Sequence, residues 1–595
     1  MIPRTVKLRW RRRIRDSKRQ VETLGTQAEE QLDRNLFRRF GKLPLVRRFV
    51  LSWVALVVIL SGVVVYQTTT LGQYYKVQQP VAGGIYREGL IGAFTDANPL
   101  YATGPVDGAV SRLLFASLLK YNDDNSLVGD LAETWSANEK GDTYTIILKD
   151  NLRWHDGQPL TAEDVVFTYK TIQNPDARSP LLSSWQGIAV EAQGDRTVVF
   201  TLPNTLASFP YSLTNGIVPQ HILGGIDPAQ LRSDEFNTEK PVGAGPFMWD
   251  RIEIVGDTPE ARISTIALKS NEAYHLGPPK LDRFIIKAFL EEQSMVEAFE
   301  RKELTAMSGR GVDVVPDTLL DDVHVLEYNI PLTGQVGVFF RTSHEYLSDV
   351  KVRQALVKGT DQQSVVAGLG YPVVASRSPL LAGQIGYDSN IVQLAFDREG
   401  AARLLDEAGW LVGPEGYRVK DGKTLQFNLY AQNSGEYTFV TQQIQKDWQA
   451  IGVKIEVMLQ DADDLQSTVT YHNYDALLYG IAIGPDPDVF VYWHSSQADV
   501  RVANRVNFSE YASTVANEAL EAGRTRTDPQ IRAVKYKPFL QSWQNDAPAV
   551  MLYQPRLLYL AHQEIYNFDT RTINDATQRY ANVHQWMIRS AKVPR

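Results

Sequence analysis

Apolar and polar positions alternate over some stretches of the chain and recur at helical spacing over others. Residues 144–148 (YTIIL) and 197–202 (TVVFTL) have the composition and alternation of β-strands. Between residues 440 and 451 apolar side chains recur every three or four positions, the run stops at Gly452, and alternation resumes over 453–457. This order predicts a helix that leads directly into a strand, and hence an α/β protein.

Two further helices are predicted from their capping residues. Thr161 precedes one of them, and Asp164 stands at the third helical position, where a carboxylate can accept a hydrogen bond from the backbone of the cap. Asp397 precedes the other, whose apolar stripe ends at Gly409. A chain of 595 residues is too long for a single core, so we expect at least two lobes.

One apolar segment, residues 49–66 (FVLSWVALVVILSGVVVY), stands out because it carries no charge over 18 positions. That length approaches the roughly 20 residues that a helix needs to cross a bilayer. Five Lys and Arg residues lie within 38–48 and the residues after the segment are nearly neutral, so the positive-inside rule places the N-terminus in the cytoplasm. The alternative is a cleaved signal peptide, but the long basic region and the lack of a small-x-small cleavage pattern favour a retained anchor.

The formal net charge of −8 combines two opposite regions. Residues 1–48 hold 15 Lys and Arg against 5 Asp and Glu, so the rest of the chain carries a net charge of −18. An acidic body argues against a nucleic-acid partner, because phosphate contacts require clustered Lys and Arg on a folded surface. The chain has no cysteine, which excludes disulfides, thiolate metal sites, a catalytic thiol and a lipid-modified cysteine.

No motif in the sequence indicates an enzyme. Residues 155–157 (HDG) are interpreted as a turn, because no nucleophile motif accompanies them. Residues 243–246 (GAGP) are interpreted as a tight turn, because no Lys follows as a phosphate-binding loop requires. The sequence lacks the G-x-S-x-G, H-E-x-x-H and P-loop motifs, and its nine histidines show no metal-ligand spacing. We therefore predict no catalytic residue, no metal and no cofactor.

Several stretches together resemble the large solute-binding proteins of dipeptide and oligopeptide ABC importers, known as extracellular solute-binding protein family 5. The longest is 131–169, LAETWSANEKGDTYTIILKDNLRWHDGQPLTAEDVVFTY, which follows the signature of that family nearly throughout. The other stretches keep the order of the family: VGAGPF at 242–247, NEAYHLGPPKLD at 271–282, SDVKVRQAL at 348–356, FDREGAARLLDEAGW at 396–410, IQKDWQAIGVKIEV at 444–457, YDALLYG at 474–480 and NDAPAVMLYQP at 545–555. The resemblance extends from about residue 84 to the C-terminus.

This resemblance implies an α/β fold of the two-lobed periplasmic-binding-protein type (large, cluster C type), with an extra subdomain in the first lobe and one transmembrane helix before it. The two lobes would close on a ligand held between them. The implied partners are a peptide or another small solute, the membrane through residues 49–66, and ABC permease and ATPase subunits, with the binding domain extracellular or periplasmic. The implied parts are a basic cytoplasmic tail (1–48), the transmembrane helix (49–66), a stalk (67–82), a first lobe (83–333 with 546–595) and a second lobe (334–545).

In peptide-binding members of this family the ligand lies extended and two segments hold its backbone. By motif order these segments correspond to Thr103-Gly104-Pro105 and Tyr479-Gly480-Ile481-Ala482. Family members place an aspartate for the α-amine of the peptide, and often a tryptophan, near the second segment, but this sequence has Ile483 and Gly480 at those positions. A buried ammonium group without a partner is costly, which disfavours free dipeptides as the cargo.

Three further residues are candidates for the same site. Asp486 could replace the missing aspartate after a shift of the loop, although Asp beside Pro is also common in turns. Trp493, within the run Tyr492-Trp493-His494, could line the pocket with aromatic surface or pack in the core. Arg377, in a predicted loop of the second lobe, could pair with an anionic group of the ligand.

These observations favour a receptor that delivers peptides to an ABC importer. The missing amine partner keeps a second cargo open for the same type of receptor, an oligosaccharide or a metal chelate. An anchored hydrolase and a signalling or structural module with a degenerate pocket are the remaining alternatives. Turnover of a peptide or an ester would indicate the hydrolase, and an empty, wide-open, hydrophobic cleft would indicate the module.

Overall fold

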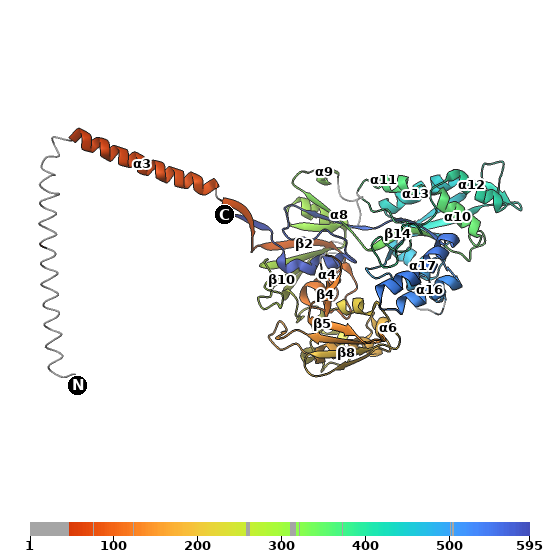
Figure 1. Cartoon of the computed structure of the whole chain (residues 1–595), viewed down its shortest axis with the longest axis horizontal. Helices are drawn as coiled ribbons and strands as arrows, with labels where there is room; N and C mark the ends of the chain where they lie inside the picture. The colour runs from red at the N-terminus through yellow and green to blue at the C-terminus, as the bar shows by residue number, and fades with distance from the viewer. Residues whose placement is uncertain are drawn as a thin grey trace. The chain divides into compact units, whose positions relative to one another are not determined.

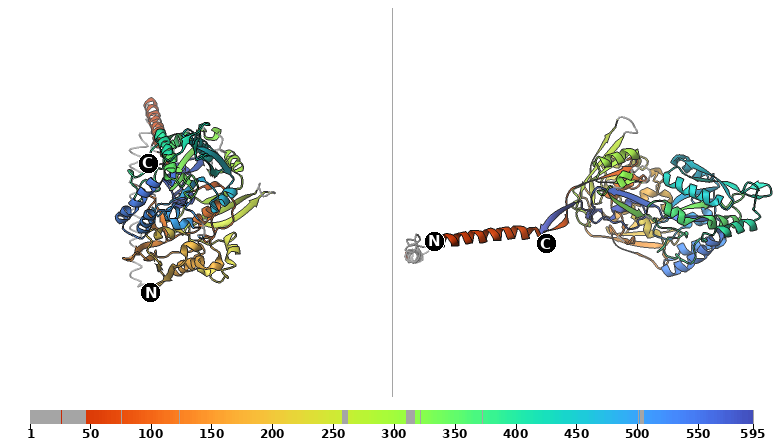
Figure 2. Two further views of the ribbon diagram at one scale, coloured as in Figure 1. Left: turned by 90° about the vertical axis from the view of Figure 1, so that its right-hand side faces the viewer. Right: turned by 90° about the horizontal axis from the view of Figure 1, so that it is seen from above.

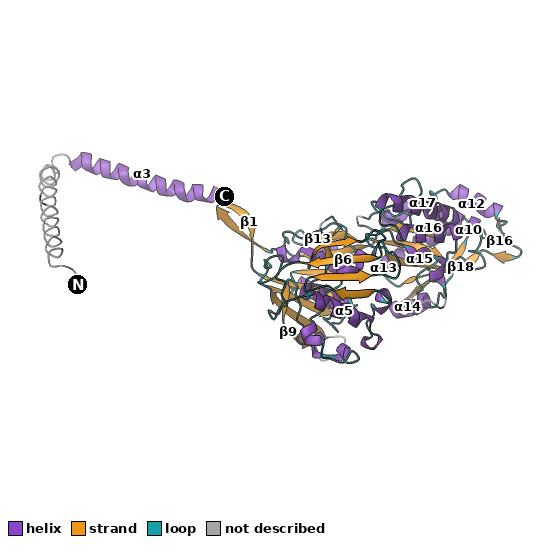
Figure 3. Cartoon of the chain, turned by 60° about the horizontal axis from the view of Figure 1, so that its bottom comes forward, coloured by secondary structure: helices purple, strands orange, loops and turns teal. Residues whose placement is uncertain are grey.

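The computed structural model describes residues 26, 47–74, 76–122, 124–256, 262–309, 317–320, 322–371, 373–499, 501 and 505–594. Most of the predicted basic tail, residues 1–48, lies outside these residues. The chain divides into two compact units, one made of residues 1–79 and 590–595 and the other of residues 80–589. Figures 1 and 2 show the elements coloured along the chain, and Figure 3 shows them by type.

The first unit contains a long helix, α3 (Arg47–Tyr74), and most of a two-stranded sheet of β1 (Lys76–Val81) and β23 (Arg589–Pro594). Residues 47–69 of α3 have the length and the apolar composition to cross a membrane, with a mean hydropathy of 2.5. The helix is longer than the predicted span of 49–66 and includes much of the predicted stalk, 67–82. No proline occurs between Tyr66 and Pro80, so nothing in the sequence forces the helix to end at residue 66.

A seven-stranded mixed sheet forms the base of the first lobe, in the order β13-β22-β12-β2-β11-β10-β9. Strand β2 pairs in parallel with both of its neighbours, and the other pairs are antiparallel. Its strands are β2 (Ile85–Ile91), β9 (Phe247–Val255), β10 (Ile263–Ser270), β11 (Arg283–Phe289), β12 (Ala306–Gly309), β13 (Leu326–Pro331) and β22 (Arg556–Ala561). Because β22 comes from the C-terminal part of the chain, this lobe is built from discontinuous segments. Its helical segments are α4 (Pro105–Leu114), α8 (Glu292–Glu300), α9 (Asp317–Leu320) and the 3-10 helix η8 (Ala576–Gln585).

An additional subdomain interrupts this lobe between β2 and β9. Its four-stranded antiparallel sheet, β5-β6-β8-β7, includes both strands predicted from alternation. The predicted capping box of α5 is confirmed, since the backbone N–H of Thr161 donates to Asp164 Oδ2 over 2.8 Å. The elements are β3 (Leu119–Tyr121), β4 (Leu127–Gly129), β5 (Ala132–Ala137), β6 (Thr143–Leu148), β7 (Ala189–Ala192), β8 (Thr197–Thr201), α5 (Ala162–Gln173), α6 (Leu182–Trp185), α7 (Gln220–Leu223), and the 3-10 helices η3 (Pro175–Ala177), η4 (Phe209–Thr214), η5 (Leu231–Ser233) and η6 (Glu235–Asn237).

The second lobe is built on a five-stranded sheet in the order β19-β18-β20-β14-β21. Strand β14 is buried on both faces, because Val336, Val338 and Phe340 belong to one apolar cluster and Phe339 belongs to another. The strands are β14 (Gly334–Phe340), β18 (Gln426–Gln432), β19 (Lys454–Gln460), β20 (Ala476–Ala482) and β21 (Ala549–Tyr553), with a small separate sheet of β15 (Leu411–Val412), β16 (Arg418–Lys420) and β17 (Lys423–Thr424).

The helices of this lobe confirm the predicted caps. The side chain of Asp397 accepts a hydrogen bond from Gly400 N over 2.8 Å at the start of α12, and α13 leads into β19 across Gly452, whose φ is +84°. The helices are α10 (Val350–Gly359), α11 (Gln362–Gly368), α12 (Arg398–Glu407), α13 (Gly435–Gln449), α14 (Ala462–Thr470), α15 (Phe490–Trp493), α16 (Thr514–Arg524), α17 (Pro529–Asp546) and the 3-10 helix η7 (Ser495–Ala498).

Two short connections join the main sheets. One leads from β13 to β14 through residues 332–333, and the other leads from β21 to β22 through residues 554–555. They are held together, since Leu332 N donates to Pro555 O over 2.8 Å. Because β21 pairs with β14, the second sheet includes residues 549–553, beyond the predicted end of the second lobe at residue 545. The composition of β21 (AVMLY) did not reveal that this strand belongs to the second sheet, because a fully apolar strand fits the interior of either lobe.

Residues 155–157 and residues 243–246, the two segments that the sequence analysis interpreted as turns, lie in contact with each other. Gly243 N donates to His155 Nδ1 over 3.1 Å, and His155 Nε2 lies 3.1 Å from Gly245 O. A Cβ atom at Gly243 would lie 1.9 Å from the carbonyl oxygen of Leu114, so only glycine permits this approach of two backbones. Burial lowers the pKa of His155 to about 4, so this histidine is a neutral, structural hydrogen-bonding residue.

Candidate ligand-binding site

Strand β20 is paired along its whole length on one flank only. Its seven residues, 476–482, all pair with β14, whereas β18 pairs only with Ala476 and Leu477. No described strand pairs with residues 478–482 on the β18 flank. Unpaired backbone N–H and C=O groups on a strand flank can accept an additional strand. The predicted segment 479–482 lies within this unpaired stretch.

The surroundings of this flank are defined by two tyrosines from neighbouring helices. A Cβ atom at Gly480 would lie 3.0 Å from the hydroxyl oxygen of Tyr437 in α13, so a larger residue would be crowded there. The hydroxyl of Tyr492 donates to Ala482 O over 2.6 Å at the end of the strand. Tyr479 is half-buried, and its ring centroid lies 5.2 Å from that of Phe508. Gly480 therefore keeps the backbone approachable where family members often carry a bulky tryptophan.

Ile483 follows β20 at the predicted position of the amine partner. Its backbone N–H donates to Thr333 O over 2.9 Å, which ties the end of the strand to the connection between the lobes. Its side chain is partly buried and packs against the apolar cluster of the second lobe. An aliphatic side chain offers no acceptor for an ammonium group.

The other predicted segment begins α4 in the first lobe. Gly104 is the N-cap residue of this helix, and the side chains of Thr103 and Pro105 are exposed. The preceding loop is fixed by Asp107, whose carboxylate accepts hydrogen bonds from Thr95 N over 2.7 Å and from the Thr95 hydroxyl over 2.6 Å. Residues 103–105 therefore lie on a rigid helix start in the lobe opposite to β20.

Asp486 is engaged in a buried ion pair. Arg532 of α17 donates from Nη1 to Asp486 Oδ2 and from Nη2 to Asp486 Oδ1, both over 2.7 Å. Only 6% of Asp486 and 3% of Arg532 are exposed. Asp486 thus has a structural partner of its own, in agreement with the interpretation of Asp-Pro as loop structure.

Trp493 and Arg377 have opposite surroundings. Trp493 is fully buried, with its ring centroid 5.8 Å from those of Phe339 and Trp543, so its side chain packs in the core, which was the alternative to lining a pocket. Arg377 is exposed, and no carboxylate among the described residues lies within ion-pair distance of it. Its backbone carbonyl accepts a hydrogen bond from Gln393 N over 2.7 Å, which fixes the loop.

A set of hydrogen bonds joins the two lobes through the loop that follows β20, and the sequence analysis did not predict it. Ser208 of the first lobe donates to Asp488 Oδ2 over 3.1 Å, and Arg524 of the second lobe donates to the same oxygen over 3.1 Å. The backbone N–H of Ala207 donates to Arg524 O over 2.9 Å. Burial raises the pKa of Asp488. No local signal in the sequence marks these residues, because they come from segments 280 positions apart.

No group of three His, Cys, Asp or Glu side chains that could hold a metal ion occurs among the residues that the structure describes. The features of the site are therefore a strand flank open to backbone pairing, an aliphatic residue at its end, and a polar contact that joins the lobes beside it.

Two lobes on separate sheets, with a discontinuous first lobe and paired connections between them, define the class of two-lobed periplasmic binding proteins. The chain belongs to the bacterial extracellular solute-binding proteins, family 5, because the model of the middle region of that family matches residues 126–501. The predicted family and fold class are thereby confirmed.

Individual relatives agree with this assignment. The chain is 26% identical over 488 residues to the oligopeptide-binding protein AppA of Bacillus subtilis, covering 80% of this chain and 87% of AppA. The structure of AppA in complex with a nonapeptide matches with a TM-score of 0.68 and 24% identity, over 86% of this chain and all of the other. The structure of NikZ from Campylobacter jejuni in complex with Ni(L-His) matches with a TM-score of 0.69 and 25% identity, over 84% of this chain and 99% of NikZ.

Proposed function

We propose that this protein is a receptor that delivers peptides to an ABC importer. The unpaired flank of β20 carries this proposal, because an extended peptide can add to such a flank through its backbone. Backbone recognition tolerates different side chains, so the cargo varies more in sequence than in length. The likeness to a peptide-bound oligopeptide-binding protein supports the same assignment.

In this proposal residues 103–105 and 479–482 hold the ligand from opposite lobes. Thr103 and Pro105 are exposed at the start of α4, where they are accessible to a solute between the lobes. Arg377 is an exposed cation without a carboxylate partner among the described residues, and it pairs with an anionic group of the cargo. The protein binds and releases its solute unchanged and has no catalytic activity of its own.

The end of the strand decides which peptides bind. Ile483 offers no acceptor, and both carboxylate oxygens of Asp486 are bonded to Arg532. A free α-amine at this position would lose its hydration without gaining a partner, so the cargo either presents another group there or extends past this point. The same observation supports a second candidate, a receptor for a non-peptide solute such as an oligosaccharide or a metal chelate. The structural likeness to NikZ in complex with Ni(L-His) favours keeping this candidate.

The proposal includes a membrane anchor formed by α3. Residues 47–69 are long and apolar enough to span a bilayer, and the Lys and Arg residues before them place the N-terminus in the cytoplasm. The binding domain then faces the permease from the extracellular or periplasmic side. An intact mass that corresponds to the full chain in the membrane fraction, resistant to an alkaline wash, supports a retained anchor. A mature protein that starts after residue 66 overturns it and indicates a signal peptide.

The function is tested by identifying the solute that co-purifies with the protein. The full chain is extracted in mild detergent, kept folded through purification and then denatured, and the released molecules are analysed by mass spectrometry. Peptides of similar length and varied sequence, released in a one-to-one ratio, support the peptide receptor. A released sugar or metal chelate moves the assignment to the second candidate.

A further inference from the structure

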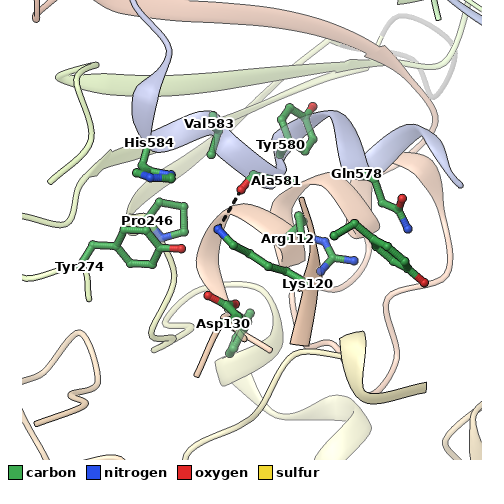
Figure 4. A pocket seen from close by; sticks show the side chains of 12 residues that line it. Arg112, Lys120, Asp130, Pro246, Tyr274, Gln578, Tyr580, Ala581, Val583 and His584 are labelled. Atoms are coloured by element: carbon green, nitrogen blue, oxygen red, sulfur yellow. Dashed lines mark hydrogen bonds between the residues drawn. The ribbon is translucent and has the colours of Figure 1, made fainter. Parts of the chain in front are cut away.

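A small cavity in the first lobe is lined by both charged and apolar residues of that lobe. It is enclosed by β3, α4, η8 and nearby loops, and its volume is about 30 Å³. Figure 4 shows the ends of Lys120, Tyr274 and His584 directed toward the same space, with Arg112 beyond them. A single water molecule needs about 10–15 Å³ on this scale, so the cavity holds about two waters or one monatomic ion.

The groups that line the cavity have more hydrogen-bond donors than acceptors. The Lys120 ammonium group has three donors, and among the residues that the structure describes its one partner is Ala581 O, over 3.3 Å. The Arg112 guanidinium group has five donors, and its one partner in the described part of the chain is Thr214 O, over 3.2 Å. Among the described residues, the Tyr274 hydroxyl has no hydrogen-bond partner.

The carboxylate of Asp130 and the amide oxygen of Gln578 each already accept hydrogen bonds from other residues. Asp130 Oδ1 lies 2.8 Å from His275 Nε2, and Asp130 Oδ2 accepts a hydrogen bond from Ser117 N over 3.0 Å. The Gln578 side-chain oxygen accepts a hydrogen bond from Asn574 N over 3.0 Å, which leaves its amide N–H groups as further donors. The cavity therefore lacks an acceptor for several of its donors.

The side chains that line the cavity include more positive than negative charges. Lys120 and Arg112 form no ion pair with any carboxylate that the structure describes, whereas the carboxylate of Asp130 is paired with His275. Burial, and then the positive charge of Lys120, lower the pKa of His584 to about 4. Burial also lowers the pKa of Lys120. Asp130 acts in the opposite direction and raises the pKa of Lys120, so the lining contains two cations and one carboxylate.

We propose that this cavity binds one small monovalent anion of halide size, held by Lys120, Arg112 and Tyr274. A halide accepts hydrogen bonds and donates none, so it satisfies the unused donors, which a water molecule does only in part. At about 30 Å³ the cavity matches a monatomic ion better than sulfate or phosphate, each of which has five heavy atoms. The bound ion joins β3, α4 and the loop between β10 and β11, and it thereby fixes the helix that begins within the candidate ligand segment 103–105. This inference does not depend on the identity of the cargo.

The test measures halide binding by the full chain in detergent. At constant ionic strength, replacing gluconate by chloride or bromide is expected to raise the midpoint of thermal unfolding by about 2 °C in a saturable way. The ³⁵Cl resonance is expected to broaden in the presence of the protein, and bromide is expected to remove that broadening by competition. Lys120→Met removes the central charge at similar length and abolishes both effects, whereas Lys240→Met, at an exposed ion pair, leaves them unchanged.

If Lys120→Met does not fold, Tyr274→Phe decides the matter, because it removes one donor and keeps the ring. At least threefold weaker bromide binding by Tyr274→Phe supports the site. Equal halide effects in Lys120→Met and Lys240→Met overturn it, as does a stronger stabilisation by sulfate than by chloride, which indicates a general salt effect. Displacement of chloride by acetate but not by bromide also overturns it and assigns the cavity to a carboxylate group of the cargo.

Discussion

Asp486 and Arg532 form a bidentate ion pair that is almost completely buried, with both N–O distances at 2.7 Å. The pair joins the loop after β20 to α17, 46 residues further along the chain. Arg532 also donates from Nε to Gly523 O over 3.1 Å, so the same guanidinium group holds the end of α16. One ion pair thus positions the loop that borders the candidate site against two helices.

Arg532→Met should destabilise the protein strongly, because it leaves the carboxylate of Asp486 buried without its cationic partner and, among the described residues, with only the hydrogen bond from Asp488 N. Removing one member of a buried pair costs about 3–5 kcal/mol. Urea unfolding of the full chain, followed by the fluorescence of the second lobe, measures this loss. The matched control is Arg403→Met, since Arg403 is exposed and lies 3.8 Å from Glu399; that variant should change stability by less than about 0.5 kcal/mol. Equal effects of both substitutions would show that the buried pair contributes no more than a surface pair.

Ile483→Asp should increase the affinity for peptides with a free α-amine. The new carboxylate supplies a charge-assisted hydrogen bond at the end of β20, worth about 1.5–3 kcal/mol, which corresponds to about a 10- to 100-fold change in Kd. Calorimetric titration with one peptide in free and N-acetylated form checks this, because only the free form should gain. Ile483→Asn is the neutral control of similar shape. An unchanged or lower affinity for the free peptide would mean that residue 483 does not face the amine.

Much of the fold could be predicted from local patterns. The capping box at Thr161 and Asp164, and the helix that leads into β19, depend on neighbours within a few residues, and both are present as expected. The assignment of β21 to the second sheet could not be predicted in this way. Its five apolar residues satisfy any buried strand, and only pairing with β14, more than 200 positions earlier, decides which lobe it joins.

Sequence reasoning could propose segments for the candidate site but not the contacts that surround them. Position 483 was proposed by counting back from the Asp-Pro-Asp run, and it directly follows β20. The ion pair of Asp486, however, depends on an arginine in a distant helix. Trp493 shows the same limit, because a tryptophan beside a ligand segment has the same sequence pattern whether it faces a cleft or a core.

Ser208→Ala should weaken the closed state of the two lobes. The substitution removes one hydrogen bond across the lobes, from the Ser208 hydroxyl to Asp488 Oδ2, while Arg524 still neutralises the carboxylate. We expect the solute to dissociate about 3- to 10-fold faster, with little change in the rate of association. Stopped-flow measurement with a fluorescent solute follows both rates. Ser233→Ala, in an exposed 3-10 helix of the same lobe, should leave them unchanged. Slower association at an unchanged dissociation rate would contradict a role for Ser208 in holding the lobes closed.

Asp96 should make the stability of the first lobe depend on pH. Its carboxyl group is buried beside Asp107, and its Oδ1 accepts a hydrogen bond from Asn98 N over 2.8 Å. Burial is the main cause that raises its pKa from 3.8 to about 7, and Asp107 adds to the shift while Arg232 opposes it. The folded protein therefore binds the proton more tightly than the unfolded chain does. The stability from this group is complete below about pH 3.8 and is lost as the pH rises toward 7.

Asp96→Asn should remove this pH dependence, because the amide stays neutral and its oxygen can still accept the hydrogen bond from Asn98. Relative to the wild type, the variant should be about equally stable near pH 4 and more stable by about 2–4 kcal/mol at pH 8, since each unit of pKa shift corresponds to about 1.4 kcal/mol. Urea unfolding at intervals between pH 4 and pH 8 measures the difference. Asp388→Asn, at an exposed carboxylate whose pKa is lowered by its hydrogen bonds to Asn390, should retain the decline of the wild type over this window. A constant difference between Asp96→Asn and the wild type at all pH values would show that the Asp96 carboxyl group does not titrate in this range. In that case its burial would be offset by contacts that stabilise the ionised form.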